Sequence, residues 1–323
     1  MPSLLIRLHS LGDVVLAEPA ARFLAGSDPV LFAVREEYAP VVERMGEGVR
    51  PLPLPAGGGA CDLRRLARGF APGRIVDLQG NLTSRLAVWP RRADRWTLDR
   101  KLRKRILGGA DLHMPYRATE FLRTAGGGGW AMPHLERRSP VGGGSGRAGL
   151  VAGGRWLGKS IPPGVLAEVA RRLVDLVGME VLVLGAPEDR DAAREVAGRA
   201  LRKGVTPMAG EGGLERLMER IESLDVLVSP DSGPAHLASA LGVPVVVVFT
   251  STHPRLGFWP PDMQGAVFSG DLACRPCHRH GGRSCPRGDW ECRRGLLPAD
   301  IVDAALSVMG SGAEDDFEDG EPD

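Results

Sequence analysis

The chain has 323 residues, of which 43% are hydrophobic, and its 41 basic and 40 acidic residues give a net charge of +1. This length favours two domains of ordinary size. No apolar run reaches about 18 residues, which argues against a membrane-spanning helix. Because Met1-Pro2 leads directly into a strand-like segment, we expect no signal peptide and a cytoplasmic protein.

The charge is unevenly distributed along the chain. Residues 1–110 hold 18 basic and 11 acidic residues, whereas residues 314–323 hold seven acids and no base. Taking those seven negative charges away from the total of +1 leaves the rest of the chain at +8. We predict a disordered acidic tail over 310–323. The basic remainder favours an acidic substrate or an anionic membrane surface, and no nucleic-acid partner is expected because no recognition module accompanies the charge.

Strand-like and helix-like segments alternate in the first part of the chain. The expected strands are 3–8, 30–34, 49–54 and 74–78, and the expected helices are 14–25, 39–45, 63–70 and 81–89. Such alternation predicts an α/β fold with a parallel sheet covered by helices on both faces. Ligands of these sheets bind beyond the carboxyl ends of the strands. The turns that hold Asp13 and Asp77 both fall at such ends.

A basic stretch and a glycine-rich stretch then interrupt the pattern. The basic stretch covers residues 91–105 and is either a solvated surface or a docking site for an acidic acceptor. Glycines crowd residues 126–129 and 142–146, which indicates a flexible connection. We therefore expect one domain over 1–145 and another over 146–309.

The alternation restarts in the second domain. Its expected strands are 148–152, 181–185, 226–229 and 243–249, and its expected helices are 165–177, 190–201, 214–221 and 235–241. The nearly continuous valine run in the strand 243–249 is typical of a strand buried on both faces.

The stretch 227–241 is the most informative part of this domain. An apolar strand turns through Pro230-Asp231-Ser232-Gly233-Pro234 into an Ala/Leu-rich helix. Such a turn directs the first helical N–H groups and the positive end of the helix dipole toward an anion such as a diphosphate. A well-capped helix without a ligand is the alternative, with Asp231 or Ser232 as the N-cap.

Five segments in order resemble the ADP-heptose:lipopolysaccharide heptosyltransferases, glycosyltransferase family 9. They are Ile6-Arg7-Leu8-His9-Ser10-Leu11-Gly12-Asp13, Asp77-Leu78-Gln79-Gly80-Asn81, Lys159-Ser160-Ile161-Pro162, Leu184-Gly185-Ala186-Pro187-Glu188-Asp189 and Ser229-Pro230-Asp231-Ser232-Gly233-Pro234-Ala235-His236-Leu237-Ala238. Ile161 stands where the family has Trp and Ser232 where it has Thr, and residues 90–145 match poorly.

The resemblance implies a fold and an activity. The fold is GT-B-like, with two Rossmann-like parallel-sheet domains facing each other across a cleft. The activity is an inverting, metal-independent transfer of a heptose from ADP-heptose to a hydroxyl of a lipopolysaccharide-core-like acceptor. Its partners would be this nucleotide-sugar donor and a lipid-linked anionic glycan, with peripheral association at the cytoplasmic face of the inner membrane.

The resemblance also implies roles for single residues. Asp13 would be the general base that accepts the acceptor proton, although a helix N-cap is the structural alternative. Lys159 and the N–H groups at Ser232-Gly233 would stabilise the leaving diphosphate, although Lys159 also suits a solvated loop. The expected substrate-binding set is Ser10, Gly12, Lys159, Glu188, Asp231, Ser232, Gly233, Pro234 and His236, with Glu188 at the donor ribose.

Four of the five cysteines lie close together in the sequence. Cys274, Cys277, Cys285 and Cys292 follow a C-x2-C-x7-C-x6-C spacing in a loop of the second domain over 274–292. This spacing predicts a structural zinc ion, with His278 or His280 able to replace one thiolate. Reduced, partly buried thiols are the alternative. No cofactor is expected for catalysis.

Other functions remain open at this point. The same fold would serve a different nucleotide-sugar donor for another surface glycan, or a catalytically inactive nucleotide-sugar-binding protein. A dinucleotide-dependent oxidoreductase is excluded because no Gly-x-Gly-x-x-Gly follows any expected strand.

Overall fold

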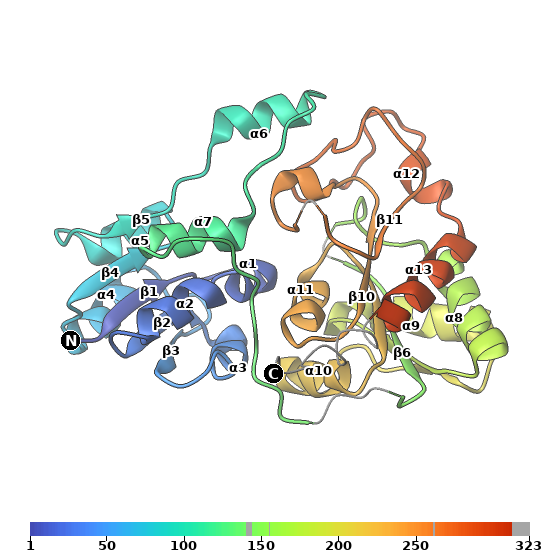
Figure 1. Ribbon diagram of the computed structural model, residues 1–323, viewed down its shortest axis with the longest axis horizontal. Helices are drawn as coiled ribbons and strands as arrows, with labels where there is room; N and C mark the ends of the chain where they lie inside the picture. Colours follow the sequence, from blue (N-terminus) through green and yellow to red (C-terminus); the bar gives the residue numbers. More distant parts are fainter. Residues whose placement is uncertain (140–143, 155, 261, 312–323) are drawn as a thin grey trace, which may run out of the picture. The chain divides into compact units, whose positions relative to one another are not determined.

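The computed structural model describes residues 1–139, 144–154, 156–260 and 262–311, and the chain divides into two compact units (Figure 1). The first unit consists of Met1–Arg103, Met114–Arg138 and Gly257–Trp259, and the second of Lys104–His113, Ser139–Leu256 and Pro260–Asp323. The sequence analysis predicted the domain boundary between residues 145 and 146. Residues 140–143 of the glycine-rich stretch and 312–323 of the expected tail lie outside the described residues.

Within the described residues, the first unit is built on a sheet of five parallel strands in the order β3-β2-β1-β4-β5. The strands are β1 (Ser3–Ile6), β2 (Val30–Arg35), β3 (Val49–Leu54), β4 (Arg74–Asp77) and β5 (Asp94–Arg95). Ile6 lies opposite both Ala33 and Asp77. The turns that follow β1 and β4 are therefore neighbours at the carboxyl edge of this sheet, where ligands of parallel sheets bind.

Several helices of the first part of the chain pack on this first sheet. Between residues 11 and 124 the chain forms α1 (Leu11–Val15), α2 (Glu18–Ala25), η1 (Glu36–Tyr38), α3 (Ala39–Val42), α4 (Ala60–Gly69), α5 (Leu82–Val88), α6 (Arg100–Leu107) and α7 (Arg117–Thr124). Leu4, Ile6 and Leu8 pack with Ala67 of α4 and Ala87 of α5 in one core cluster. This packing fixes α5, and with it the turn that precedes α5, against the sheet.

The part of the chain that the structure describes forms a six-stranded parallel sheet in the second unit, in the order β11-β10-β9-β6-β7-β8. The strands are β6 (Arg147–Val151), β7 (Glu180–Leu184), β8 (Val205–Pro207), β9 (Val226–Pro230), β10 (Val245–Phe249) and β11 (Ala266–Phe268). Every residue of β9 is buried, as expected for a central strand with helices on both faces.

The helices of the second unit bury one continuous core against this sheet. They are α8 (Pro163–Val177), η2 (Pro187–Asp189), α9 (Arg190–Ala200), α10 (Gly213–Glu222), α11 (Gly233–Ala240), η3 (Pro254–Leu256), α12 (Glu291–Arg294) and α13 (Pro298–Ser311). Leu173 of α8, Val196 of α9 and Ile301 of α13 belong to the same cluster as the strand residues Leu150 and Val228. The predicted α/β class, with two Rossmann-like parallel sheets, is confirmed.

Two expected elements differ from the structure. The helix predicted over 14–25 is two helices, because α1 ends at Val15 and α2 starts at Glu18 with Pro19 in its first turn. Proline lacks an N–H group and suits a helix start rather than a helix interior. Gly310 and Ser311, which the sequence placed in the tail, belong to α13.

Among the described residues, the structure contains no helix that is both long enough and apolar enough to cross a membrane.

Candidate functional site

The turn after β9 brings two of the expected site residues together in the second unit. Lys159 comes from the loop that follows β6, and its Nζ donates to the backbone carbonyl of Asp231 at 2.7 Å. The same Nζ lies 2.8 Å from Asp231 Oδ2, with 17% of the lysine side chain exposed. The ammonium group is thus held at the start of α11, where the sequence placed a diphosphate-binding group.

The start of α11 is arranged to present backbone N–H groups. Ser232 is the N-cap in an extended conformation, and its hydroxyl does not cap the helix. That hydroxyl instead lies 3.0 Å from Ser229 Oγ. Gly233 and Pro234 form the first positions of the helix, and His236 is buried one turn further. A helix start whose N-cap side chain is engaged elsewhere leaves N–H groups for an anion.

The turn after β7 presents Glu188 to solvent. Glu188 lies exposed in η2, while the next residue, Asp189, is half-buried and accepts a hydrogen bond from the Ala186 N–H at 2.9 Å. Burial raises the pKa of the Asp189 carboxyl, and its backbone hydrogen bonds oppose that shift. Asp189 therefore shapes the turn, and the Glu188 side chain stays exposed.

Asp13 lies in the first unit, as the third residue of α1, and is buried. Its Oδ2 lies 2.5 Å from Arg7 NH2, and its Oδ1 accepts a hydrogen bond from Arg117 NH1 at 2.9 Å. The N-cap of α1 is Ser10. The N-cap alternative for Asp13 is therefore wrong, because Ser10 holds the N-cap position and the Asp13 carboxylate pairs with two guanidinium groups.

The arginine that holds Oδ1 is itself fixed by aromatic rings. The guanidinium carbon of Arg117 lies 4.6 Å from the ring centroid of Trp96 and 4.7 Å from that of Phe258. Burial lowers the pKa of Arg117, and the charge of Asp13 opposes this shift. Sequence reasoning missed Arg7 and Arg117 as partners of Asp13. The one signal was Arg7 itself, a charged residue in an otherwise apolar strand.

The loop between β1 and α1 also contains Ser10 and Gly12. Ser10 has φ 73, in the left-handed region that residues with a side chain rarely adopt. Its carbonyl accepts the Val14 N–H at 2.9 Å. Such strained positions concentrate at functional sites, which is consistent with the expected role of Ser10 and Gly12 in substrate binding.

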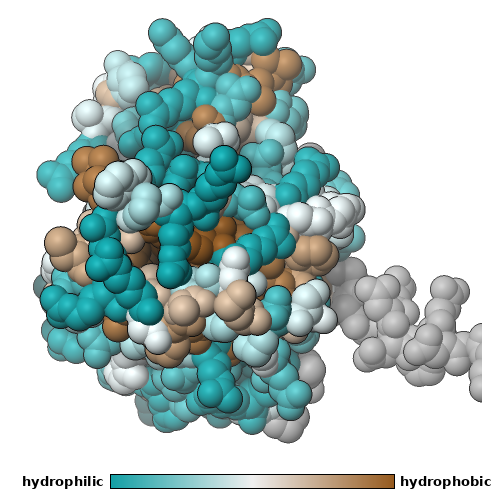
Figure 2. Space-filling view, turned by 90° about the vertical axis from the view of Figure 1, so that its left-hand side faces the viewer, coloured by the Kyte–Doolittle hydropathy of each residue, from teal (hydrophilic) through white to brown (hydrophobic). Residues whose placement is uncertain are grey.

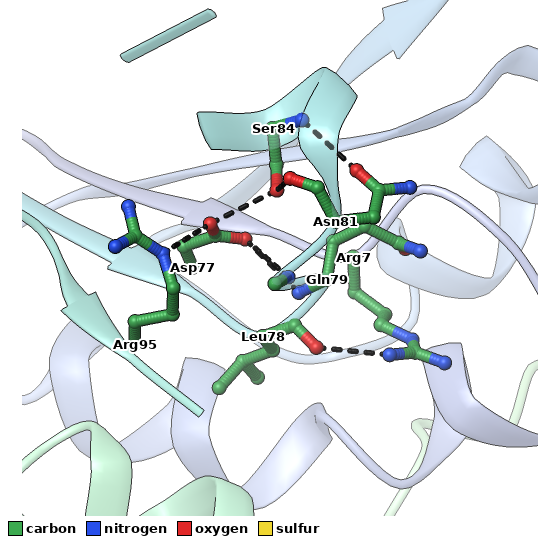
Figure 3. Close-up of polar contacts among 8 residues, drawn as sticks. Arg7, Asp77, Leu78, Gln79, Asn81, Ser84 and Arg95 are labelled. Carbon is green, nitrogen blue, oxygen red and sulfur yellow. Dashed lines mark hydrogen bonds and ion pairs between the residues drawn. The ribbon is translucent and has the colours of Figure 1, made fainter. Parts of the chain in front are cut away.

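Asp77 organises the neighbouring turn after β4 (Figure 3). Its buried carboxylate accepts hydrogen bonds from the Gln79 and Gly80 N–H groups at 3.1 and 2.9 Å. It also accepts from Ser84 Oγ at 2.9 Å and from Arg95 Nε at 3.0 Å. With four donors around it, Asp77 joins β4, α5 and β5 and serves the structure of the turn.

Two other residues of this turn extend the network. Gln79 Oε1 accepts the Leu8 N–H at 2.9 Å, which ties the turn to the end of β1. Asn81 caps α5 by accepting the Ser84 N–H at 3.0 Å. Arg7 donates to the Leu78 carbonyl at 2.9 Å, so the partner of Asp13 is held by the same turn (Figure 3).

The cysteine segment does not form the expected zinc site. All four cysteines are free, and the described residues contain no group of three or more His, Cys, Asp or Glu side chains placed to hold a metal ion. Cys277 Sγ is directed to the Ser251 carbonyl at 3.9 Å and Cys285 Sγ to Asp289 Oδ1 at 3.6 Å. Burial raises the pKa of Cys292 to about 11. The arrangement matches reduced, partly buried thiols.

A protein-family comparison matches residues 148–285 to glycosyltransferase family 9 (heptosyltransferase). The match covers less than half of the chain. The family 9 segment holds Lys159, Glu188 and the β9–α11 turn, so the family resemblance of the sequence is confirmed.

Curated relatives agree with this assignment over shorter stretches. Lipooligosaccharide heptosyltransferase 2 of Campylobacter jejuni is 29% identical over 110 residues, which cover 32% of each protein. Lipopolysaccharide heptosyltransferase 2 of Escherichia coli K12 is 31% identical over 98 residues, covering 29% of this chain and 27% of that protein. These alignments therefore span about a third or less of the relatives' length.

Solved structures match nearly the whole chain. The E. coli ADP-heptose lipopolysaccharide heptosyltransferase II has a TM-score of 0.74 at 19% identity, covering 97% of this chain and all of that one. An iron-containing dodecameric glycosyltransferase, TibC of enterotoxigenic E. coli, has a TM-score of 0.63 at 14% identity, covering 97% of this chain and 76% of that one. At these identities the likeness shows the fold, which is that of the GT-B-like heptosyltransferases.

The network around Asp77 gives a stability prediction. In Asp77→Asn, the amide N–H₂ group faces hydrogen-bond donors that the carboxylate accepted, so donor meets donor. The ion pair with Arg95 is also lost. We expect the free energy of unfolding to fall by about 2–4 kcal/mol, measured by urea denaturation. Asp94→Asn is the matched control, because Asp94 forms an exposed ion pair with Arg74 and should cost less than about 1 kcal/mol. Equal losses for the two variants would contradict the structural role of Asp77.

Proposed function

We propose that the chain is an inverting glycosyltransferase that moves a heptose from ADP-heptose to a hydroxyl of a lipopolysaccharide-core-like acceptor. The observation that carries the proposal is the Lys159–Asp231 pair at the start of α11, inside the segment that matches family 9. The names of the two curated relatives and of the E. coli heptosyltransferase II structure, all three heptosyltransferases, support the choice of sugar.

In this proposal the second unit binds the donor. Lys159 neutralises the diphosphate, and the first N–H groups of α11 at Ser232-Gly233 donate to its oxygens. Without a ligand, Asp231 holds the ammonium group at 2.8 Å. Lys159 has three N–H donors, so it keeps this position while it donates to phosphate. Glu188 meets the ribose, and Asp231 and His236 meet oxygens of the sugar and phosphate.

The first unit supplies the base. As the acceptor oxygen forms its bond to the anomeric carbon, its proton passes to the Asp13 carboxylate, and the bond between the anomeric carbon and the β-phosphate oxygen breaks. ADP leaves with the electron pair, and the configuration at the anomeric carbon inverts. Arg7 and Arg117 hold both carboxylate oxygens of Asp13, which fixes the orientation of the group that accepts the proton.

The chemistry needs no divalent cation in this scheme. Charge that develops on the leaving ADP is met by the Lys159 ammonium and by the dipole of α11, which are preorganised donors of the kind that stabilise leaving groups. The acceptor in this proposal is a lipid-linked anionic glycan. The enzyme therefore works in the cytoplasm, at the inner face of the inner membrane.

The function is tested with a donor panel. Purified protein is given a lipopolysaccharide-core acceptor with ADP-heptose, UDP-sugars or GDP-sugars, with and without EDTA, and nucleotide release is measured. We expect release from ADP-heptose at a rate that EDTA does not change. Turnover of another donor would favour the alternative of a different surface glycan. Donor binding without turnover of any donor would favour an inactive nucleotide-sugar-binding protein.

Removal of the Lys159 charge should weaken donor binding. In Lys159→Ala we expect the dissociation constant for ADP, measured by calorimetry, to rise about tenfold, because one charge-assisted hydrogen bond to phosphate is lost. Because Asp231 already neutralises part of the lysine charge, the expected loss of affinity lies at the lower end of the usual range for such bonds. Lys203→Ala removes an exposed lysine of the same unit and should leave ADP affinity unchanged. Unchanged affinity in Lys159→Ala would contradict the assignment.

Removal of the base should separate turnover from donor binding. Asp13→Asn keeps the shape of the side chain but cannot accept the proton, so turnover should fall by about 10²–10⁴-fold. ADP affinity should stay within about twofold of the wild-type value, because Lys159, Asp231 and α11 are unchanged, and the ADP titration also reports that the second unit is folded. A variant with near wild-type turnover would show that Asp13 is not the base.

A further inference from the structure

Helix α5 exposes large apolar side chains along one face. Leu82 is 71% exposed, Leu86 49% and Trp89 68%. Positions three and four residues apart on a helix lie on the same side, so these three side chains form one stripe. The opposite side of α5 is buried through Ser84, Ala87 and Val88. A contiguous exposed apolar stripe on a folded domain is typical of an interaction surface.

Basic side chains surround this stripe. Arg85, Arg91 and Arg92 are exposed within or directly after α5. Arg64 of α4 donates to the Leu86 and Ala87 carbonyls, which places α4 and its exposed Arg65 and Arg68 next to α5. Residues 60–92 contain seven arginines and only two aspartates.

The two aspartates offset only part of this positive charge. Asp77 is fully buried and pairs with Arg95, outside this stretch. Asp62 accepts the Gly59 N–H at 3.0 Å at the start of α4 and pairs with Arg65 at 3.8 Å. Apolar side chains, a tryptophan and arginines side by side are the combination that binds the interface of an anionic bilayer.

We propose that the α5 face, which we define as Leu82, Arg85, Leu86, Trp89, Arg91 and Arg92, docks onto an anionic phospholipid bilayer. The leucines and the tryptophan enter the headgroup region, and the arginines meet lipid phosphates. Figure 1 labels α5 at the left, and Figure 2 views that side, where separate apolar patches lie among mostly hydrophilic side chains.

The position of α5 connects this surface with the acceptor chemistry. The turn that starts α5 follows β4, and β4 pairs with β1, which ends just before Asp13. Docking through α5 holds the carboxyl edge of the first sheet near the membrane, where a lipid-linked acceptor is anchored. This benefit rests on the proposed function, whereas the docking itself does not depend on catalysis.

The test is flotation of the full chain with vesicles, without donor or acceptor. The probes are vesicles of phosphatidylcholine with phosphatidylglycerol and vesicles of phosphatidylcholine alone. We expect binding to the anionic vesicles only, weakened by added salt. Leu86→Ser with Trp89→Ser should reduce binding at least about tenfold, and Arg91→Glu with Arg92→Glu by at least a similar factor.

The matched control removes apolar side chains elsewhere. Leu176→Ser with Leu201→Ser changes two side chains of the second unit that are 72% and 79% exposed, and this variant should bind as the wild type does. Circular dichroism of each variant shows whether it is folded, and the salt dependence of the wild-type protein tests the electrostatic part without any variant.

Three results would overturn the proposal. The first is absence of the wild-type protein from the floated anionic vesicles, and the second is flotation of the α5 variants to the same extent as the wild type. The third is a dimer in sedimentation that Leu86→Ser with Trp89→Ser dissociates, which assigns the stripe to a second copy of the chain. Turnover of a soluble acceptor fragment, measured separately, shows whether the proposed function stands in each case.

Discussion

A carboxylate buried at the end of a parallel strand must find hydrogen-bond donors, and this requirement organises the first unit. Asp77 and Asp13 follow neighbouring strands, β4 and β1, and they meet the requirement in different ways. Asp77 takes backbone N–H groups, a serine and Arg95, and so determines the shape of its turn. Asp13 takes the guanidinium groups of Arg7 and Arg117. The same chemical group thus serves structure at one strand end and, in the proposed function, accepts a proton at the next.

The two networks are also coupled. Arg7 holds Asp13 on one side and the carbonyl of Leu78 on the other, so the turn that Asp77 shapes also positions the proposed base. Arg117 completes the arrangement from α7, with its guanidinium between Trp96 and Phe258. Aromatic faces that contact a cation and exclude water strengthen its interaction with a carboxylate.

The second unit uses the same edge of a parallel sheet for a different purpose. Its β9–α11 turn combines a lysine, an aspartate and a helix N-terminus within hydrogen-bond distance. Here the charged groups stay partly accessible, since Lys159 is 17% exposed. A group that binds a diphosphate, as proposed for Lys159, must be reachable from solvent. Asp77 is fully buried, because its partners all belong to the chain itself.

The sequence by itself determined the alternation of strands and helices, the two parallel sheets and the five motifs of the family, because hydrophobic period and turn residues are local properties. It also placed Lys159 and Asp231 in one site through the family resemblance. Only the tertiary structure decided what each charged group contacts. Arg117 reaches Asp13 from more than a hundred residues away, and Cys277 and Cys285, two of the four cysteines that spacing assigned to zinc, are directed to separate partners. Spacing along the chain fixes neither the direction of a side chain nor its long-range partner, since both follow from packing.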